Sequence, residues 1–212
     1  MNFLAHAALA HDAALRWSAD EAQTTGLLAG AVIGDYVKGR IPTDWPIALQ
    51  AGVALHRRID AISNRHFGIQ ATCNTYPDDL RRYAPIFIDL LADHSLARDW
   101  SRYYEKTEKN AVSEACYKAL NAHLDKLPAN GIRFASYMQE VDLLANYDEW
   151  SHVEQGFQSV LRRLNVTLDP GRVLSVCANQ IGATDMLLTT LYPDLRAEFD
   201  HYNALNAVRG NS

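Results

Sequence analysis

The segment that decides the fold is EAQTTGLLAGAVIGDYV, residues 21–37, in which Gly26, Gly30 and Gly34 recur at every fourth position. Its apolar residues follow a helical period, and residues four apart lie on one face of an α-helix. Three glycines weaken an isolated helix by about 1 kcal/mol each, so their presence needs a structural reason. We therefore predict that the glycine face of this helix permits close approach of another backbone.

The rest of the chain shows the same helical periodicity, and no segment alternates as a β-strand does. We expect Pro85 to end, kink or start a turn in its segment and Pro193 to break the chain before a last helix. The sequence thus predicts an all-α, single-domain helical bundle over residues 1–212, with a tail that frays from about residue 206. The further helices are expected at residues 47–66, 78–106, 110–127, 132–145, 149–164 and 170–191, and near 195–205.

The composition agrees with an ordinary globular helical protein. The chain has 212 residues, of which 48% are hydrophobic and 21% charged, and this excludes wholesale disorder. Its 11 glycines and 7 prolines fall well below the roughly 12% that these residues reach on average. This scarcity of turn-forming residues argues against a fold of many β-strands.

The net charge, the hydropathy and the cysteines argue against a nucleic-acid-binding, membrane-spanning or disulfide-linked protein. With 20 Lys and Arg against 25 Asp and Glu, the formal net charge is −5, which argues against nucleic-acid binding through a bulk positive field. No stretch reaches the ~20 apolar residues of a membrane span, and residues 1–15 lack the basic start of a signal peptide. Cys73, Cys116 and Cys177 have no CxxC spacing, so we expect reduced thiols in a cytoplasmic protein.

The stretch LHRRID, residues 55–60, carries the first candidate for chemistry. His56 and Asp60 are four residues apart, so on a helix their imidazole and carboxylate can converge on one cation. Nitrogen and oxygen ligands together suit manganese, iron or zinc better than calcium. Taken alone, however, this spacing is more typical of an exposed ion pair worth a few tenths of a kcal/mol.

Three more acidic residues and a histidine strengthen the case for a metal. Asp89 and Asp93 are also four apart, with His94 beside them, in the apolar segment PIFIDLLADHSLA. Repelling carboxylates in such a segment are costly unless a cation or hydrogen-bond donors compensate them. Asp35 directly follows the glycine face. With these residues included, a metal site and a purely structural arrangement become equal alternatives.

Other polar residues in these segments have simpler interpretations. His6 stands in the apolar stretch NFLAHAALA, and we expect it to be a satisfied core histidine. Arg57 and Arg58 follow His56 on the same helix, turned from it by about 100° and 200°, so at most one can reach an anion at the metal. A guanidinium there would suit phosphate oxygens, and an ordinary surface arginine pair is the alternative.

Four elements of the sequence, taken in order, resemble the bacterial acyl carrier protein phosphodiesterases, also called acyl carrier protein hydrolases. The resemblance covers roughly the first half of the chain, and the second half matches only as helical patterning. The elements are MNFLAHAALA, GLLAGAVIGDYVKG, GVALHRRIDAISN and RYAPIFIDLLADHSLARDW, at residues 1–10, 26–39, 52–64 and 82–100.

The resemblance implies an activity and a metal. The family is related to the HD-domain metal-dependent phosphohydrolases, so an HD-domain-like helical fold is implied. The implied reaction is hydrolysis of the phosphodiester that joins 4′-phosphopantetheine to a serine of holo-acyl carrier protein, which leaves apo-acyl carrier protein. The implied divalent metal is Mn²⁺, with Mg²⁺ or Fe²⁺ as alternatives. The chain lacks the adjacent His-Asp pair of the HD pattern, and the nearest element is the reversed Asp93-His94.

The resemblance and the residue chemistry together define the expected site. One or two divalent ions would lower the pKa of a water that attacks phosphorus, and an arginine would stabilise charge on the phosphate oxygens. Asp89 or His94 would orient a ligand or move a proton. The expected metal ligands come from Asp35, His56, Asp60, Asp89, Asp93 and His94. The expected catalytic residues are Asp35, His56, Arg57, Asp60 and Asp93, and the expected substrate-binding residues are Lys38, Arg57 and Arg58.

The charge distribution bears on the partner that the resemblance implies, an acidic carrier protein. Residues 1–105 hold 10 Lys and Arg against 12 Asp and Glu, and four of those carboxylates are expected at the metal. The first half of the chain would then be locally basic and would attract an acidic protein. Nucleic-acid and membrane partners are not expected. The candidate docking residues are Arg40, Arg81, Arg82, Arg98 and Arg102.

Two other functions stay open on the sequence. An HD-type phosphohydrolase of a nucleotide or another small phosphate ester would have the same metal site but would act without a carrier protein. A non-catalytic helical binding protein would use the His and Asp clusters structurally and would bind no divalent ion. The sequence contains no P-loop, no GxGxxG after a strand and no GxSxG motif.

Overall fold

Helix α2 (Glu21–Ile33) begins with a capping box. The Asp20 side chain accepts a hydrogen bond from the backbone N–H of Gln23 at 2.8 Å, and the Gln23 side chain accepts one from the N–H of Asp20 at 3.1 Å. This reciprocal pair satisfies two N–H groups that a helix start otherwise leaves free. The helix ends at Ile33, and the chain continues in the 3₁₀ turn η1 (Gly34–Tyr36), so α2 is shorter than predicted.

The glycine face of α2 packs directly on α3 (Ile47–Arg65). A Cβ placed on Gly30 would lie only 2.3 Å from the carbonyl oxygen of Leu49, and one on Gly52 would lie 2.5 Å from the carbonyl oxygen of Leu27. Carbon atoms in van der Waals contact stay about 3.5–4.0 Å apart, so no side chain fits at either position. The predicted close backbone approach is therefore confirmed, with α3 as the partner helix.

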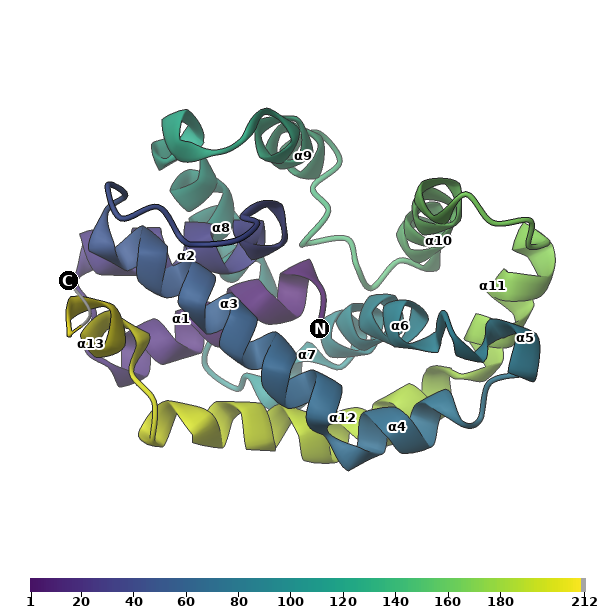
Figure 1. Ribbon diagram of the computed structural model, residues 1–212. Helices are drawn as coiled ribbons and strands as arrows, with labels where there is room; N and C mark the ends of the chain where they lie inside the picture. The colour runs from purple at the N-terminus through teal and green to yellow at the C-terminus, as the bar shows by residue number, and fades with distance from the viewer. Residues whose placement is uncertain (211–212) are drawn as a thin grey trace.

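The computed structural model describes residues 1–210, and residues 211–212 lie outside it. The described residues form α-helices and short 3₁₀ helices and contain no β-strand, which confirms the predicted all-α class. The other α-helices are α1 (Phe3–Arg16), α4 (Phe67–Cys73), α5 (Asp78–Arg81), α6 (Ala84–Arg98), α7 (Trp100–Tyr103), α8 (Lys109–Ala122), α9 (Ala129–Glu140), α10 (Trp150–Leu164), α11 (Pro170–Asn179), α12 (Ile181–Ala197) and α13 (Ala204–Arg209) (Figure 1). The remaining 3₁₀ helices are η2 (Leu124–Lys126) and η3 (Glu198–Asp200).

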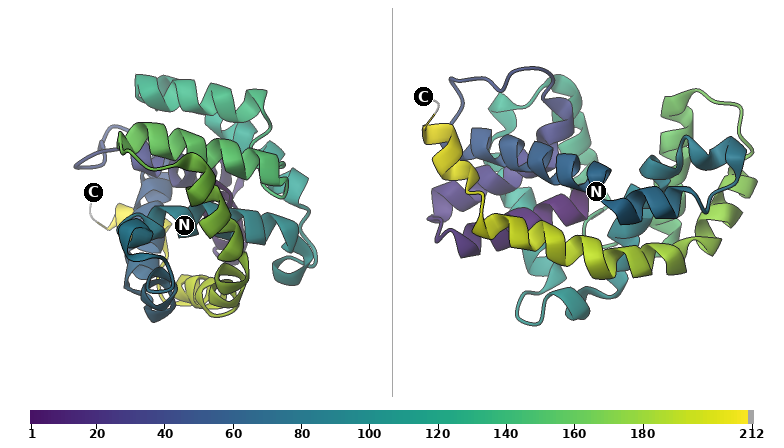
Figure 2. Two further views of the ribbon diagram at one scale, coloured as in Figure 1. Left: turned by 90° about the vertical axis from the view of Figure 1, so that its right-hand side faces the viewer. Right: turned by 60° about the horizontal axis from the view of Figure 1, so that its bottom comes forward.

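Helix α1 lies at the centre of the bundle, and every residue from Leu4 to Ala10 is buried. It contacts α2, α3, α6, α8 and α12. Helix α12 runs along one side of the molecule and contacts α1, α3, α4 and α6 (Figure 1 and Figure 2). In Figure 1, α9 lies above the chain start and α10 lies above it to the right, with α6 packed against α10. This arrangement brings the start of α1, the end of α2 and the middle of α3 together.

The structure differs from the predicted helices at the C-terminal end. The expected helix over residues 170–191 is divided at Gln180 into α11 and α12. Pro193 does not break the chain but lies inside α12, where its ring is exposed while Tyr192 and Leu195 beside it are at most 1% exposed. Burial of these neighbours holds the helix past a proline that costs it one hydrogen bond. The tail, expected to fray from about residue 206, is helical through Arg209.

Two further predictions concern the described residues. Cys73, Cys116 and Cys177 form no disulfide, as their spacing predicted. No helix between residues 1 and 210 combines the length and the apolar character that a membrane span requires.

Candidate metal centre

His56 of α3 points to the centre of the molecule, and its ring occupies the space that Gly34 leaves because it has no side chain. A Cβ on Gly34 would lie 2.3 Å from Cγ of His56, so only glycine leaves room for the ring. His56 is 4% exposed, and its Nδ1 lies 2.8 Å from the carbonyl oxygen of Ala31. Because a carbonyl oxygen only accepts, Nδ1 donates this hydrogen bond and Nε2 points into the site.

His6 of α1 meets His56 and Asp60 of α3. Nε2 of His6 lies 3.1 Å from Oδ1 of Asp60, and Nε2 of His56 lies 3.2 Å from Oδ2 of the same carboxylate. The two imidazole rings stack with their centroids 4.0 Å apart. The ligand atoms of these three residues all lie within 4.8 Å of one another. We call His6, His56 and Asp60 the metal cluster, since a single cation can be reached by all three.

The role expected for His6 changes as a result. The sequence predicted a satisfied core histidine, and the ring is indeed buried at 1% exposure. However, its Nδ1 has no hydrogen-bond partner among the described residues, and its Nε2 is directed at Asp60. The ring is therefore part of the cluster. The sequence signal for it lay in the element MNFLAHAALA, but an apolar helix start does not reveal which other helix a histidine will face.

The three groups of the cluster hold different protonation states. Burial and the charge of His56 lower the pKa of His6 to about 4, so His6 is neutral at neutral pH. Burial also opposes the charge on His56, but the contacts with Asp35 and Asp60 outweigh it and raise the pKa of His56 to about 9. Burial likewise opposes the charge on Asp60, but its hydrogen bonds to both histidines hold its pKa well below the usual range. Without a cation, the cluster is thus an ion pair of His56 and Asp60 beside a neutral imidazole.

Asp35 lies at the open side of the cluster. It is part of η1, and its Oδ1 is 3.7 Å from Nε2 of His56. Its side chain is 62% exposed, whereas that of His56 is 4% exposed. Interaction with His56 lowers the pKa of Asp35. An ionised carboxylate therefore borders the cluster on the side that faces solvent.

Asp89 is connected to the cluster through the amino group of Met1. That nitrogen lies 2.8 Å from Oδ1 of Asp89 and 3.9 Å from Oδ1 of Asp60. The side chain of Asp89 remains 38% exposed. Asp89 thus lies beside the cluster, but a cation, the ammonium group, separates it from Asp60.

Asp93 and His94, which the sequence placed in the pool of metal ligands, have other partners. Asp93 is fully buried and accepts hydrogen bonds from the N–H groups of Leu4 at 2.7 Å and Ala5 at 3.0 Å. Both of its oxygens therefore cap the start of α1, even though burial raises its pKa to about 7. His94 donates from Nδ1 to the carbonyl oxygen of Tyr147 at 2.9 Å. The structure does not bring either side chain into the metal cluster.

The two arginines after His56 point to different places. Arg57 donates to the carbonyl oxygen of Val37 at 2.8 Å and so braces the segment that follows Asp35. Arg58 donates to Glu198 at 2.9 Å and lies over the ring of Tyr202, away from the cluster. Lys38, the other expected substrate-binding residue, is exposed in the segment after η1. The structure thus keeps Arg57 and Lys38 near Asp35 and directs Arg58 elsewhere.

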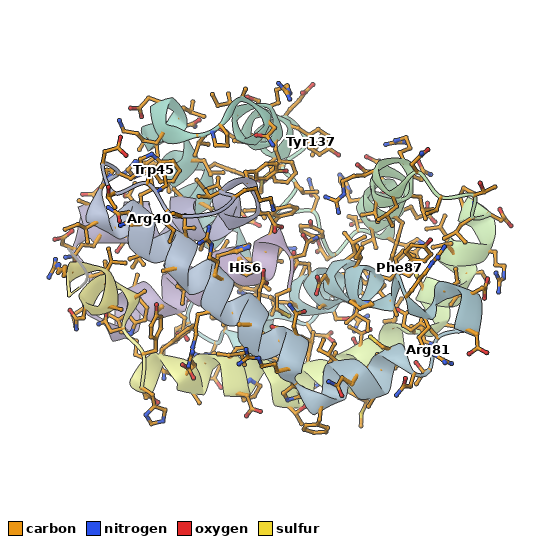
Figure 3. The ribbon with its side chains drawn as sticks, in the orientation of Figure 1. His6, Arg40, Trp45, Arg81, Phe87 and Tyr137 are labelled. Atoms are coloured by element: carbon orange, nitrogen blue, oxygen red, sulfur yellow. The ribbon has the colours of Figure 1, made fainter. Side chains whose placement is uncertain are left out.

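A cavity of about 360 Å³ adjoins the metal cluster. The start of the chain, η1, α6, α9 and α10 form its walls, and both Asp35 and Asp89 line it. Figure 3 shows Tyr137, another lining residue, on α9 above the central position of His6. The cavity thus begins at Asp35, beside the cluster, and is partly open to solvent.

Comparison with known sequences identifies the family. The profile described as acyl carrier protein phosphodiesterase matches residues 1–195. The chain belongs to the acyl carrier protein phosphodiesterase family. The resemblance seen in the first half of the sequence is confirmed, and the match extends through α11 and most of α12. The chain is thus a member of a family of phosphodiester hydrolases, as predicted.

Several curated relatives carry the family name. The acyl carrier protein phosphodiesterase of Yersinia pestis is 27% identical over 202 residues, which cover 95% of this chain and 98% of that protein. The protein of the same name from Salmonella newport (strain SL254) is 27% identical over 205 residues, or 97% of this chain and 90% of that protein. No solved structure matches the chain significantly. Similarity to the HD-domain fold therefore stays a prediction.

Proposed function

We propose that this chain is a metal-dependent phosphodiesterase that removes 4′-phosphopantetheine from the serine of holo-acyl carrier protein and leaves apo-acyl carrier protein. The observation that carries the proposal is the metal cluster of His6, His56 and Asp60 in a member of this family. Free cysteines and the nature of the substrate favour a cytoplasmic location.

The donor set fits a divalent transition metal. Two imidazole nitrogens and one carboxylate suit Mn²⁺, Fe²⁺ or Zn²⁺, whereas Mg²⁺ prefers oxygen ligands alone. The hydrogen bond from Nδ1 of His56 to Ala31 is the kind of contact that orients metal-binding histidines. His6 is already neutral, as a ligand must be, and His56 would release a proton on binding. We propose Mn²⁺ held by His6, His56 and Asp60, with Asp35 as a fourth ligand.

The residues of the chain each have a definite task in this proposal. A divalent ion at the cluster would supply Lewis-acid polarisation of the phosphoryl oxygens and activation of water. As the fourth ligand, Asp35 would hold the ion from the open side of the cluster, where its carboxylate lies beside His56. Arg57 uses one N–H group on Val37, and its other N–H groups, without partners among the described residues, would bind the phosphate oxygens. Lys38 adds positive charge at the rim.

The expected docking surface for an acidic carrier protein becomes narrower. Arg81 pairs with Asp78, and Arg98 pairs with two carboxylates, so neither offers free charge. Figure 3 shows Arg40 and Arg81 at opposite ends of the molecule. Lys38 and Arg40, whose side chains are exposed and have no ion-pair partner among residues 1–210, follow Asp35 in the chain. We propose that these two residues attract the carrier protein.

The test is the mass of the carrier protein after incubation of holo-acyl carrier protein with the purified chain and Mn²⁺. The proposal predicts loss of the phosphopantetheine mass with Mn²⁺ and no loss after chelation. An unchanged mass with Mn²⁺ bound overturns it. Hydrolysis of small phosphodiesters without any effect on the carrier protein would favour the small-ester phosphohydrolase, and absence of both metal and turnover would favour a non-catalytic helical protein.

A further inference from the structure

We propose that the cavity between α6, α9 and α10 takes the pantetheine arm of the substrate, while the serine side of the phosphodiester and the carrier protein remain outside. This inference rests on the proposed function and adds to it the direction in which the substrate enters. It also gives a role to α9 and α10, which the sequence described only as helical segments.

The first argument is continuity between the cavity and the metal cluster. Asp35 lines the cavity, and its Oδ1 is 3.7 Å from Nε2 of His56. Asp89 and Met1 also line it, and the Met1 nitrogen lies 3.9 Å from Asp60. A phosphodiester at the cluster therefore directs one of its two ester groups into the cavity. The volume of about 360 Å³ lies within the roughly 300–1,000 Å³ of small-molecule sites, far below the size of a protein.

The second argument is the chemistry of the walls. Phe134 contacts Phe3 at a centroid distance of 4.4 Å and Tyr36 at 5.3 Å, so these rings form one aromatic wall. The α10 wall carries polar side chains, among them Gln155 and Ser159. Such a mixture suits a chain in which methyl and methylene groups alternate with amides, as they do in pantetheine.

The third argument is the polar groups that the protein leaves without partners. His152 lines the cavity, and its buried Nδ1 has no hydrogen-bond partner among the described residues. The hydroxyl of Tyr147 accepts from the amide of Asn2 at 3.0 Å, which leaves its own proton to donate. Burial raises the pKa of Tyr147 well above its usual value, so that proton is kept. A buried polar group without a partner is costly, so an amide of a ligand would satisfy Nδ1 of His152, and an amide oxygen would accept the proton of Tyr147.

The charge of the lining argues against a second phosphate deep in the cavity. Besides Arg163, the cavity lining offers the amino group of Met1 as a cation, and that group is already paired with Asp89 at 2.8 Å. Asp35 adds a further negative charge. A nucleotide with several phosphates would meet too few cations there. The arm of pantetheine is uncharged beyond its phosphate, so it enters without such a requirement.

The test places a large side chain in the cavity by substituting an exposed residue of its wall. Ser159 lines the cavity and is exposed on α10, so we choose Ser159→Trp, which places an indole at the cavity wall. The matched control is Gln158→Trp, because Gln158 is exposed on the same helix but does not line the cavity. With Mn²⁺, Ser159→Trp should lower kcat/KM for holo-acyl carrier protein by at least about tenfold. The Mn²⁺ content should equal that of wild type in both variants, and the control should leave turnover of holo-acyl carrier protein unchanged.

A second measurement separates this inference from the proposed function. D-pantetheine is titrated calorimetrically into chelated, metal-free protein, where no turnover takes place. Wild type and Gln158→Trp should bind it, and Ser159→Trp should bind it at least about tenfold more weakly. Equal binding and equal carrier-protein turnover by both tryptophan variants overturn the inference, as does a wild type that does not bind pantetheine. Normal pantetheine binding without hydrolysis of holo-acyl carrier protein would instead contradict the proposed function and leave the cavity assignment standing.

Discussion

Replacement of Gly34 by alanine tests how the fold positions His56. Gly34 has φ −50° and ψ −35°, a conformation that alanine adopts without strain, so the effect of the substitution comes from space alone. The added Cβ would lie 2.3 Å from Cγ and 2.4 Å from Cδ2 of His56. Ordinary carbon contacts are about 3.5–4.0 Å, so the imidazole must move by about 1 Å or more.

The expected loss of stability and of turnover in Gly34→Ala follows from the contacts that the His56 ring makes. Movement by about 1 Å breaks the 2.8 Å hydrogen bond from Nδ1 to Ala31 and takes Nε2 away from Asp60. Overpacking of this kind lowers the free energy of unfolding by about 1–3 kcal/mol. A misplacement of about 1 Å at a reacting centre lowers the rate by about 100-fold. We therefore expect Gly34→Ala to fold, to bind Mn²⁺ weakly and to turn over holo-acyl carrier protein about 100-fold more slowly.

The assay compares Gly34→Ala with Gly182→Ala. Gly182 is exposed near the start of α12, and a Cβ there meets no atom within 4 Å, so this control should be as active as wild type and up to about 1 kcal/mol more stable. Turnover, Mn²⁺ content by elemental analysis and thermal unfolding are measured on each protein. Wild-type turnover and wild-type Mn²⁺ content in Gly34→Ala would refute the reasoning that this glycine sets the position of His56.

Three further predictions follow from the site. Asp93→Asn should lower the free energy of unfolding by about 1–3 kcal/mol, because the amide offers one acceptor oxygen where the carboxylate offers two, and the folded variant should keep its Mn²⁺. Chemical denaturation and metal analysis check this prediction, and a variant of unchanged stability that has lost its Mn²⁺ contradicts it. Arg58→Ala should retain turnover within about twofold, whereas Arg57→Ala should lose at least about tenfold, and equal losses in steady-state assays would reject the distinction. Mn²⁺ affinity should rise about tenfold per pH unit from neutrality to about pH 9, since the pKa of His56 is raised to about 9 and Mn²⁺ must displace its proton. A calorimetric titration that finds the same Mn²⁺ affinity at every pH in this range would disprove the prediction.

Much of the fold was predictable because it depends on local patterns. The spacing of the glycines in α2 predicted a close helix contact, and Gly30 against Leu49 provides it. The predicted helix boundaries were wrong where burial of neighbouring side chains outweighed the local helix-breaking tendency of a residue. At Pro193 the sequence shows a helix breaker, but the neighbouring core residues keep α12 continuous. Such an outcome depends on the packing of helices far apart in the sequence, which periodicity does not record.

The site was predictable where its residues share a helix. His56 and Asp60 are four apart on α3, so their spacing placed them on one face of the helix, where they do meet. His6 comes from another helix, so only the packing of α1 against α3 shows that it belongs to the cluster. For Asp93 the sequence left two alternatives, a cation or hydrogen-bond donors, and both of its oxygens meet backbone N–H groups. An apolar segment shows that a carboxylate needs a partner but not which partner it finds.

The most direct test of the metal cluster is Mn²⁺ stoichiometry and holo-acyl carrier protein turnover measured on the same preparations of wild type and His6→Ala. His6 is the proposed ligand that the sequence alone did not assign, and its Nε2 lies 3.1 Å from Asp60. We predict that wild type binds Mn²⁺ and releases phosphopantetheine, and that folded His6→Ala loses both the metal and the turnover. Wild-type metal content together with wild-type turnover in His6→Ala would contradict the cluster as the catalytic centre.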